Sequence, residues 1–326
     1  MQSFDYYIAA TTRRLPLTHQ LRGLRVPINI VQRFYGHRYA QRDERWAIIN
    51  DFDSDLRMKL DRASLLGSVI YWFGNYSPNE LHLLDRLLSP EMVFADIGAN
   101  QGEFTLFAAK RLTRGQVLAF EPQETIFALL SENIALNGFE NTSLHNIALA
   151  DASGVVDLYM PSEPDHPGRP AFVDLPNEGV AMIMPEGGRG LKVGSARIET
   201  FDTVFAATDL ARLDVIKIDV EGAELAVLRG ARRTIEDHKP HIFMELNRET
   251  TGASGYAITD LHTFLLDLGY MIYRIKSAWQ NDLGKNSGYL SLLRQEDVAA
   301  IAEQCDVLCA HPDHPLPISI MSIASR

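Results

Sequence analysis

The chain has 326 residues, of which 46% are hydrophobic and 22% charged, a composition that indicates one large folded domain with an extension, or two domains. Its formal net charge of -11 repels phosphate backbones, so we expect no nucleic-acid partner. The sequence has neither an apolar run of transmembrane length nor a secretory signal pattern, and two cysteines do not indicate a disulfide framework, so we predict no transmembrane segment and a cytoplasmic location.

The first 75 residues carry no chemical motif, and we expect residues 1–75 to form a mostly helical N-terminal extension. Eight arginines lie there, at positions 13, 14, 22, 25, 33, 38, 42 and 45. We interpret them as a solvated helical face or as one docked on the acidic body. The alternative is a contact for an anionic glycan, a lipid headgroup or a partner. The apolar residues of this stretch either cover a sheet edge or form a homodimer contact (Ile28, Ile30, Val31, Phe34 and Tyr35).

A helix is expected to begin at Pro78, because Ser77 can cap it and proline fits the first helical position. From Met92 onward, short apolar runs alternate with stretches of helical periodicity. We predict strands at 92–97, 116–120, 143–149, 155–160, 215–219 and 242–246, and helices at 103–112, 125–137, 224–236 and 259–268. Such alternation predicts an α/β fold, a mostly parallel sheet with helices on both faces.

Three features complete the predicted organisation. A segment rich in proline and glycine, residues 161–195, interrupts the pattern and is expected on the substrate side. Residues 270–275 and 289–293 suit a final hairpin. We therefore expect a domain over 76–296 and a C-terminal tail over 297–326, with Cys305 and Cys309 on one face of a helix.

The motif DIGANQG at 96–102 stands where the first predicted strand turns into a helix. Gly98 permits a tight turn, Gly102 lets the helix start pack closely, and the N–H groups of that helix start favour an anion. A dinucleotide fingerprint would have glycine where this chain has Asn100. Asp96 ends an apolar strand and needs a partner, which a ligand ammonium would supply. A ligand with both an ammonium and a carboxylate is an amino acid, and the methionine part of S-adenosylmethionine (SAM) fits.

Glu121 closes the second predicted strand. A carboxylate at that place accepts hydrogen bonds from both hydroxyls of a ribose and repels a 2′-phosphate, which argues against NADP. The alternative is a surface acid at a strand end.

Further acids follow two later strands. Asp219 ends the strand 215–219, and Glu221 and Glu224 lie close behind it, where they would position a hydroxyl, act as a base or hold a cation. The spacing does not match a cluster of metal ligands, so we predict no metal, and Glu224 also suits a plain helix start. Glu245 lies near the end of strand 242–246, and beside Asp219 it would have a raised pKa and suit a general base. A satisfied structural acid is the alternative.

Five segments, in this order and spacing, resemble the FkbM-family methyltransferases: FADIGANQGEFT, AFEP, NIALAD, VIKIDVEGAELAVLRGA and PHIFMEL. The resemblance runs from about Tyr76 to about Leu293. It implies a Rossmann-like class I methyltransferase fold with a seven-stranded sheet, SAM as the methyl donor and S-adenosylhomocysteine (SAH) as the product. It also implies mainly O-methylation, with hydroxyls of sugars or natural products as acceptors.

Carried over residue by residue, the resemblance assigns a role to each motif. The methionine end of SAM would lie on the glycine-rich loop (Asp96, Gly98, Ala99, Asn100 and Gly102). Glu121 would hold the ribose, and Asn146 and Ala148 would lie by the adenine. The catalytic acids would face the acceptor, with Asp219 also at the cofactor (Asp219, Glu221 and Glu245).

The reaction expected from these residues is an in-line displacement, in which Asp219 or Glu245 orients or deprotonates the acceptor. Two other functions stay open. A nicotinamide-dependent oxidoreductase on the same architecture is disfavoured by Asn100 and by the lack of a Tyr-x-x-x-Lys pair. A catalytically silent methyltransferase-like binding module is disfavoured because every cofactor acid is retained.

Overall fold

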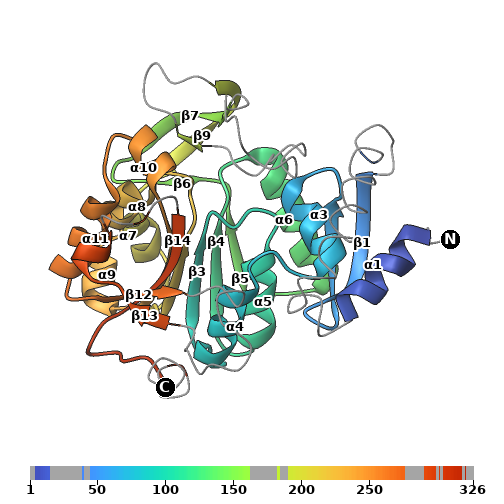
Figure 1. Ribbon diagram of the computed structural model, residues 1–326, viewed down its shortest axis with the longest axis horizontal. Coiled ribbons are helices and arrows are strands. Elements are labelled where there is room, and N and C mark those ends of the chain that lie inside the picture. The colour runs from blue at the N-terminus through green and yellow to red at the C-terminus, as the bar shows by residue number, and fades with distance from the viewer. Residues whose placement is uncertain are drawn as a thin grey trace.

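The computed structural model describes residues 4–14, 39, 45–161, 182–183, 190–275, 290–298, 301, 304–317 and 320. Strands and helices alternate in its central part as predicted (Figure 1). They are β3 (Val93–Ile97), α5 (Glu103–Arg111), β4 (Gln116–Phe120), α6 (Glu124–Asn137), β5 (Thr142–His145), β10 (Val215–Ile218), α8 (Glu224–Gly230), α9 (Arg232–His238) and β11 (His241–Asn247). In the described ranges, no helix is both long enough and apolar enough to cross a membrane.

The central sheet has the order β13-β12-β14-β11-β10-β3-β4-β5. The five strands from β11 to β5 run parallel. The chain moves outward from β3 through β4 to β5 and then returns to β10 on the other side of β3. This reversal makes the gap between β3 and β10 the switch point of the sheet, and ligands of open α/β sheets bind at the strand ends beside such a point.

Helices cover both faces of the sheet, as predicted. Side chains at alternate strand positions form two separate cores, because successive residues of a strand point to opposite faces. One core joins Ile97, Phe120 and Ile218 to α7 (Phe201–Ala206), α8, α9 and α11 (Ile258–Asp267). The other joins Phe94 and Val117 to α5 and α4 (Pro78–Leu87).

The sheet has eight strands rather than the seven expected. The difference lies at the C-terminal side, where β12 (Met271–Ile275) pairs with β13 (Leu290–Leu292) as the expected hairpin, and β14 (Gln304–Ala310) enters between β12 and β11. Residues that the sequence analysis treated as a tail thus supply an inner strand. Cys305 and Cys309 are buried on this strand and not on a helix, so the helical expectation for them is wrong.

The helix predicted over 224–236 is two helices, α8 and α9, that meet at Ala231. A side chain at Gly230 would place its Cβ only 2.0 Å from the carbonyl oxygen of Ala150, so glycine allows the close approach that accompanies the break.

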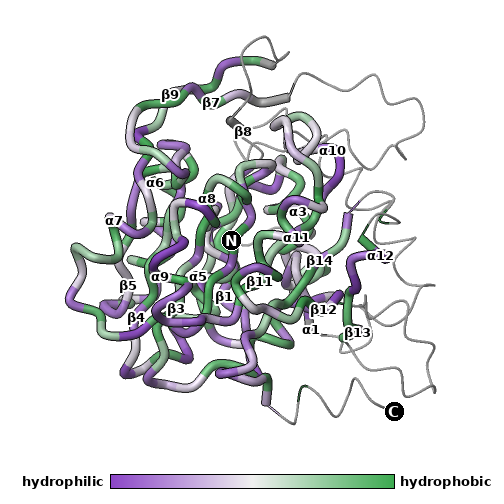
Figure 2. Tube along the Cα trace, turned by 90° about the vertical axis from the view of Figure 1, so that its left-hand side faces the viewer, coloured by the Kyte–Doolittle hydropathy of each residue, from purple (hydrophilic) through white to green (hydrophobic). Residues whose placement is uncertain are grey.

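A second sheet has the order β6-β9-β7-β8 and includes the described part of the 161–195 segment. Its members are β6 (Ala148–Leu149), β7 (Gly154–Pro161), β8 (Met182–Ile183) and β9 (Gly190–Glu199). The β7–β9 pair projects from the body in both views (Figures 1 and 2). The rest of that segment, residues 162–181 and 184–189, lies outside the described residues.

The N-terminal segment contains an antiparallel hairpin as well as helices. The hairpin is β1 (Trp46–Phe52) with β2 (Leu56–Asp61), and the helices are α1 (Phe4–Arg14) and α3 (Leu65–Phe73). These elements share a third core with α5 and α6.

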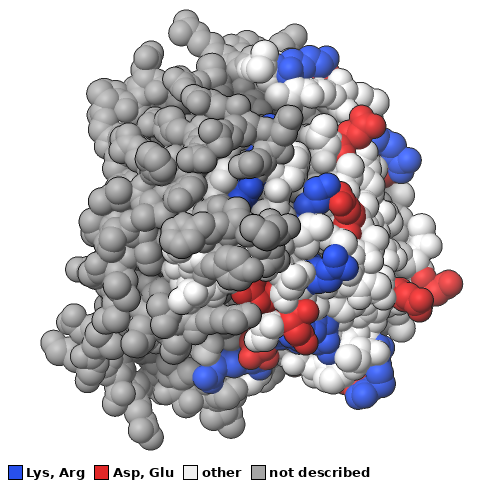
Figure 3. Space-filling view, turned by 90° about the vertical axis from the view of Figure 1, so that its right-hand side faces the viewer, with Lys and Arg blue, Asp and Glu red and all other residues white. Residues whose placement is uncertain are grey.

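Two of the eight N-terminal arginines have described ion pairs with acids of the hairpin, Arg13 with Asp51 and Arg45 with Asp61. On the face shown in Figure 3, cations and acids of the described residues are interspersed rather than gathered. Both acids belong to the N-terminal segment itself, so docking of the arginines on the acidic body stays a prediction. Arginines 22, 25, 33, 38 and 42 and the apolar residues 28–35 lie outside the described residues.

Candidate active site

A cleft lies where the carboxyl ends of β3, β4 and β10 meet at the switch point. Its lining comes from the glycine-rich loop after β3, the residues after β4, the β5–β6 connection and the turn after β10. Predicted site residues found in the lining are Gly98, Ala99, Asn100, Glu121, Ala148, Asp219 and Glu221. Asp96, Gly102, Asn146 and Glu245 lie outside it.

The glycine-rich loop is held tightly by its own backbone. The N–H groups of Gly98 and Ala99 donate to Phe120 O at 3.0 and 2.9 Å, and Gly102 N donates to Ala99 O at 2.9 Å. Gly98 has φ +79°, and a Cβ there would lie 1.9 Å from Asp219 O, so only glycine fits between β3 and β10. These N–H groups donate to carbonyl groups of the protein. An anion at the helix start would therefore have to be bound by other groups.

Asn100 continues this loop with φ +50°, and Glu221 in the turn after β10 has φ +52°. Asparagine tolerates the left-handed region, but glutamate rarely occupies it. Backbone strain of this kind is concentrated at functional sites, and both residues line the cleft.

Glu121 lies buried at the end of β4. Its Oε2 accepts a hydrogen bond from Asn100 N at 3.0 Å, and its Oε1 accepts one from Gln123 N at 2.9 Å. Burial raises the pKa of this carboxyl to about 7, although the two N–H groups favour the ionised form. Glu121 therefore joins the glycine-rich loop to the wall of the cleft and changes charge near neutral pH.

The side chain of Asn146 bonds the backbone of this wall. Its Nδ2 donates to Glu121 O at 2.8 Å and to Pro122 O at 3.1 Å. The following residues, Ile147, Ala148 and Leu149, face the cleft with Leu158 of β7. Ala148 thus lines the cleft, whereas the side chain of Asn146 bonds the backbone, and the adenine contact of both residues stays a prediction.

Asp96 has its partners within the protein and not in the cleft. It is fully buried, its Oδ2 accepts a hydrogen bond from Thr105 Oγ1 at 2.6 Å, and its Oδ1 lies 3.6 Å from Lys217 Nζ. Burial raises the pKa of Asp96, and the Lys217 ammonium opposes that rise. Lys217 therefore supplies a charged partner for Asp96 within the protein. Asp96 Oδ1 has no hydrogen bond among the described residues, so the ligand ammonium expected from the sequence stays a prediction.

Lys217 is a cleft residue that the sequence analysis did not select. Its Nζ donates to Gly98 O at 2.7 Å and lies 3.3 Å from Asp219 Oδ2. Burial alone would lower its pKa, but Asp219 and Asp96 outweigh that effect and the pKa is raised, so it stays charged. Lys217 ties the glycine-rich loop to the end of β10.

The acceptor side of the cleft is acidic. Burial raises the pKa of Glu221 to about 8, with further contributions from Asp219 and Glu245. Burial likewise raises the pKa of Glu245 to about 8, with contributions from Asp219 and Asp306. Asp219 itself is half exposed, with 47% of its side chain accessible. Burial, together with the like charges at this edge, therefore keeps part of the carboxyl groups protonated near neutral pH.

Three further acids of this region were not predicted as site residues, and two of them come together from elements distant in sequence. Glu80 on α4 and Asp306 on β14 share a carboxyl–carboxylate contact, and burial raises both pKa values. Glu103 at the start of α5 lines the cleft and accepts a hydrogen bond from Tyr76 N at 2.5 Å.

Glu224 lies in the first turn of α8, as its interpretation as a plain helix-start residue predicted. Its Oε1 accepts a hydrogen bond from Gly222 N at 3.0 Å and its Oε2 accepts one from Tyr256 OH at 2.8 Å. Among the described residues, no three acids, histidines or cysteines are grouped so as to hold a metal ion.

An open, mostly parallel sheet with a glycine-rich loop at its switch point and an acid after the next strand is the Rossmann-like fold of methyltransferases. The model of the methyltransferase FkbM domain matches residues 96–272, and the chain belongs to this family.

Individual relatives are more distant. The methyltransferase sdnD of Sordaria araneosa is 27% identical over 232 residues, which are 62% of this chain and 82% of that protein. Methyltransferase 1 of Beauveria bassiana (strain ARSEF 2860) is 32% identical over 144 residues, 41% of this chain and 56% of that protein. The crystal structure of methyltransferase FkbM from Methylobacillus flagellatus KT aligns with a TM-score of 0.42 and 17% identity, covering 68% of this chain and 44% of that one.

Proposed function

We propose that the protein transfers a methyl group from SAM to a hydroxyl of a sugar or natural product. The observation that carries the choice of a hydroxyl is the acidic turn after β10, where Asp219 and Glu221 line the cleft. Burial there raises the pKa of Glu221 to about 8. A hydroxyl must lose its proton as it takes the methyl group, and a base with a pKa near the working pH performs this transfer best. Family membership supports methyl transfer itself.

The residues of the cleft fit SAM. Glu121 presents a carboxylate to the cleft where a ribose would lie, and the apolar wall beside it suits an adenine (Ile147, Ala148, Leu149 and Leu158). Asp219 is half exposed and would meet the ammonium of the methionine part, in place of the buried Asp96. Asp96 would act indirectly, because it holds Lys217, which in turn holds Gly98 O.

Bound SAM would supply an electrophilic methyl group on a sulfonium. The chain would then have to align the acceptor hydroxyl with that methyl group and remove its proton. Glu221 is the proposed base because it lines the cleft, whereas Glu245 does not and acts through its charge. Asp219 would orient the hydroxyl or the ammonium.

The first experiment is a calorimetric titration of the protein with SAH, SAM and NAD. Micromolar binding of the two sulfur ligands without binding of NAD supports the donor assignment. Preferential binding of NAD would return the oxidoreductase to consideration and refute the proposal.

The second experiment uses SAM with an isotopically labelled methyl group and matched acceptor pairs that differ only in carrying a hydroxyl or an amine. Label on oxygen supports the proposal, and label on nitrogen alone would refute O-methylation. SAH binding without transfer to any acceptor would favour the silent binding module.

A further inference from the structure

Two asparagines of α6 pair with the outer edge of β2 as a neighbouring strand would. Lys59 N donates to Asn133 Oδ1 at 2.7 Å, and Asn133 Nδ2 donates to Lys59 O at 3.1 Å. Arg57 N donates to Asn137 Oδ1 at 2.8 Å, and Asn137 Nδ2 donates to Arg57 O at 2.7 Å. A side-chain amide has the same acceptor and donor as a peptide group. The four residues from Asn133 to Asn137 rise about 6 Å along the helix, which is close to the rise of about 6.6 Å over two residues of a strand.

Only one of these two asparagines reaches the glycine-rich loop. Asn133 is fully buried, and its Nδ2 also donates to Gln101 O at 2.9 Å. Asn137 is less buried, and its second bond returns to Asn133 O on its own helix, at 2.8 Å. Asn133 thus links the hairpin directly to the loop, and Asn137 does not.

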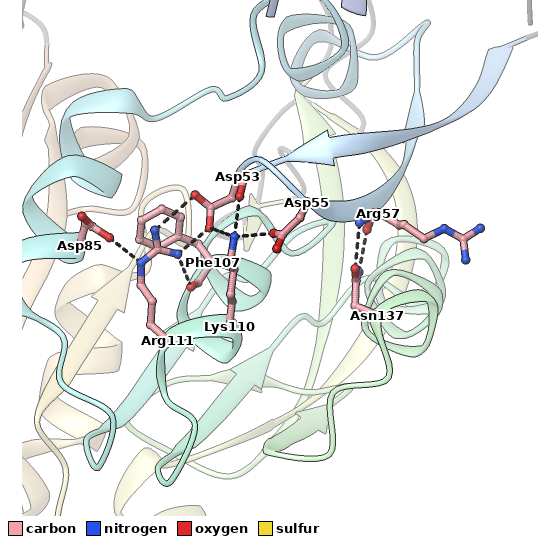
Figure 4. A network of polar contacts seen from close by, with 8 residues as sticks. All are labelled: Asp53, Asp55, Arg57, Asp85, Phe107, Lys110, Arg111 and Asn137. Atoms are coloured by element: carbon pink, nitrogen blue, oxygen red, sulfur yellow. Dashed lines mark hydrogen bonds and ion pairs between the residues drawn. The ribbon is translucent and has the colours of Figure 1, made fainter. Parts of the chain in front are cut away.

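The same hairpin is fixed to α5, the helix that begins after this loop (Figure 4). Its turn residue Asp53 bonds Lys110 Nζ through its carbonyl oxygen at 2.6 Å and Arg111 Nη1 through Oδ2 at 2.7 Å. Arg111 Nε donates in addition to Asp85 of α4 at 2.6 Å. The hairpin is therefore attached to α5 through Asp53 and to α6 through the two asparagines, so the side chain of Asn133 is held in place where it bonds Gln101.

We propose that Asn133 is a positioning residue that holds the glycine-rich loop in the form that binds SAM. This inference rests on the proposed function of the cleft. The held carbonyl belongs to Gln101, the neighbour of Asn100, whose N–H is bound to the carboxylate of Glu121. Release of that carbonyl would let the peptide of Asn100 turn and would loosen Glu121, the residue proposed to hold the ribose.

The test compares Asn133→Ala with Asn137→Ala, because each variant loses two bonds to β2 and only the first loses the bond to Gln101. We expect Asn133→Ala to weaken the binding of SAH about tenfold or more, and Asn137→Ala to change it less than about threefold. Calorimetry gives both affinities, and the Tm of each variant shows that it is folded. Equal effects of the two variants on SAH binding would overturn the inference. Failure of the unaltered protein to bind SAH would instead overturn the proposed function, and the inference with it.

Asn133→Asp provides a second measurement should the alanine variant not fold. An ionised aspartate keeps the size and the acceptor for Lys59 N but has no donor for Gln101 O, whereas a protonated one regains a single O–H donor. We expect this variant to bind SAH much more weakly than the unaltered protein at pH 8, and the ratio of the two affinities, each pair measured at the same pH, to approach one at pH 6. Affinity equal to that of the unaltered protein at pH 8 would overturn the role of the bond to Gln101.

Discussion

Glu121 combines two properties that act on its pKa in opposite directions. It receives two backbone N–H bonds, which favour its ionised form, yet burial raises its pKa to about 7. A small change of pH near neutrality therefore changes the charge that faces the proposed ribose position.

We predict that SAH binds more weakly as the pH falls below about 7, because a protonated Glu121 is a poorer acceptor for hydroxyl groups. Glu121→Gln should weaken SAH binding on the order of 10- to 100-fold and remove this pH dependence. Glu124→Gln, at an exposed position at the start of α6, is the matched control and should bind SAH as the unaltered protein does. A pH-independent affinity in the unaltered protein would contradict the role of Glu121.

Variants of Glu221 and Glu245 can distinguish the general base from the neighbouring acid that raises its pKa. With an identified acceptor, we expect kcat to rise with pH through about 8, where Glu221 loses its proton. Glu221→Gln should lower the maximal kcat reached above pH 8 about a hundredfold or more and remove this rise with pH. Glu245→Gln removes a repelling charge, so it should shift the rise to lower pH and leave the maximal rate in place.

These outcomes separate the two acids by measurement of kcat against pH. Unchanged kcat in Glu221→Gln would show that it is not the base. A large loss of the maximal rate in Glu245→Gln alone would transfer the role to Glu245.

Local sequence was enough to place Glu121 and Asp219 at the cleft, because each directly follows a strand that could be recognised from its apolar run. Lys217 shows that local sequence does not contain the contacts between neighbouring strands. The sequence places Lys217 two residues before Asp219, on the same face of the strand. Its second partner, Asp96, lies opposite it on the parallel neighbour β3. That pairing depends on the order of strands in the sheet, which a single sequence does not contain. The same is true of Glu80 and Asp306, which come together from α4 and β14.

At the scale of elements, the sequence predicted the strands and helices around the glycine-rich loop nearly to their ends. It did not predict β14 as a strand, because β14 is a short apolar run between a helical stretch and a proline-rich one. Such a run is ambiguous by periodicity alone. Only its burial between β11 and β12 identifies it.

We predict that removal of β14, by ending the chain before Gln304, prevents folding. The strand forms the contact between β11 and β12, so its loss would separate the final hairpin from the parallel strands. It would also remove buried residues of both cores (Val307, Leu308 and Cys309) and expose the core residues packed against them. Yield of soluble protein and circular dichroism test this prediction. A folded, SAH-binding product would show that residues 304–326 are a dispensable tail after all.

For the molecule as a whole, the acids gathered at one edge of the sheet oppose folding as they ionise. Burial raises the pKa of Glu121 to about 7 and those of Glu221 and Glu245 to about 8, against usual values of 4.5. Between the usual and the raised pKa, the folded protein holds more protons than the unfolded chain, so stability falls as the pH rises. His241 acts in the opposite sense, because burial lowers its pKa to about 4, but this effect ends near pH 6.5.

Above pH 6.5 the acids therefore act without opposition from His241, and we predict that the Tm falls by roughly 5 °C between pH 6.5 and 8.5. Differential scanning calorimetry without ligand measures this slope. The double variant Glu121→Gln with Glu221→Gln cannot ionise at these positions, so its Tm should depend less on pH than that of the unaltered protein. A Tm that stays constant or rises over this interval would mean that the cleft acids are solvated or paired well enough to ionise without cost. In that case Glu221 would already be a carboxylate at neutral pH, and it would be too weak a base for the proposed proton transfer from a hydroxyl.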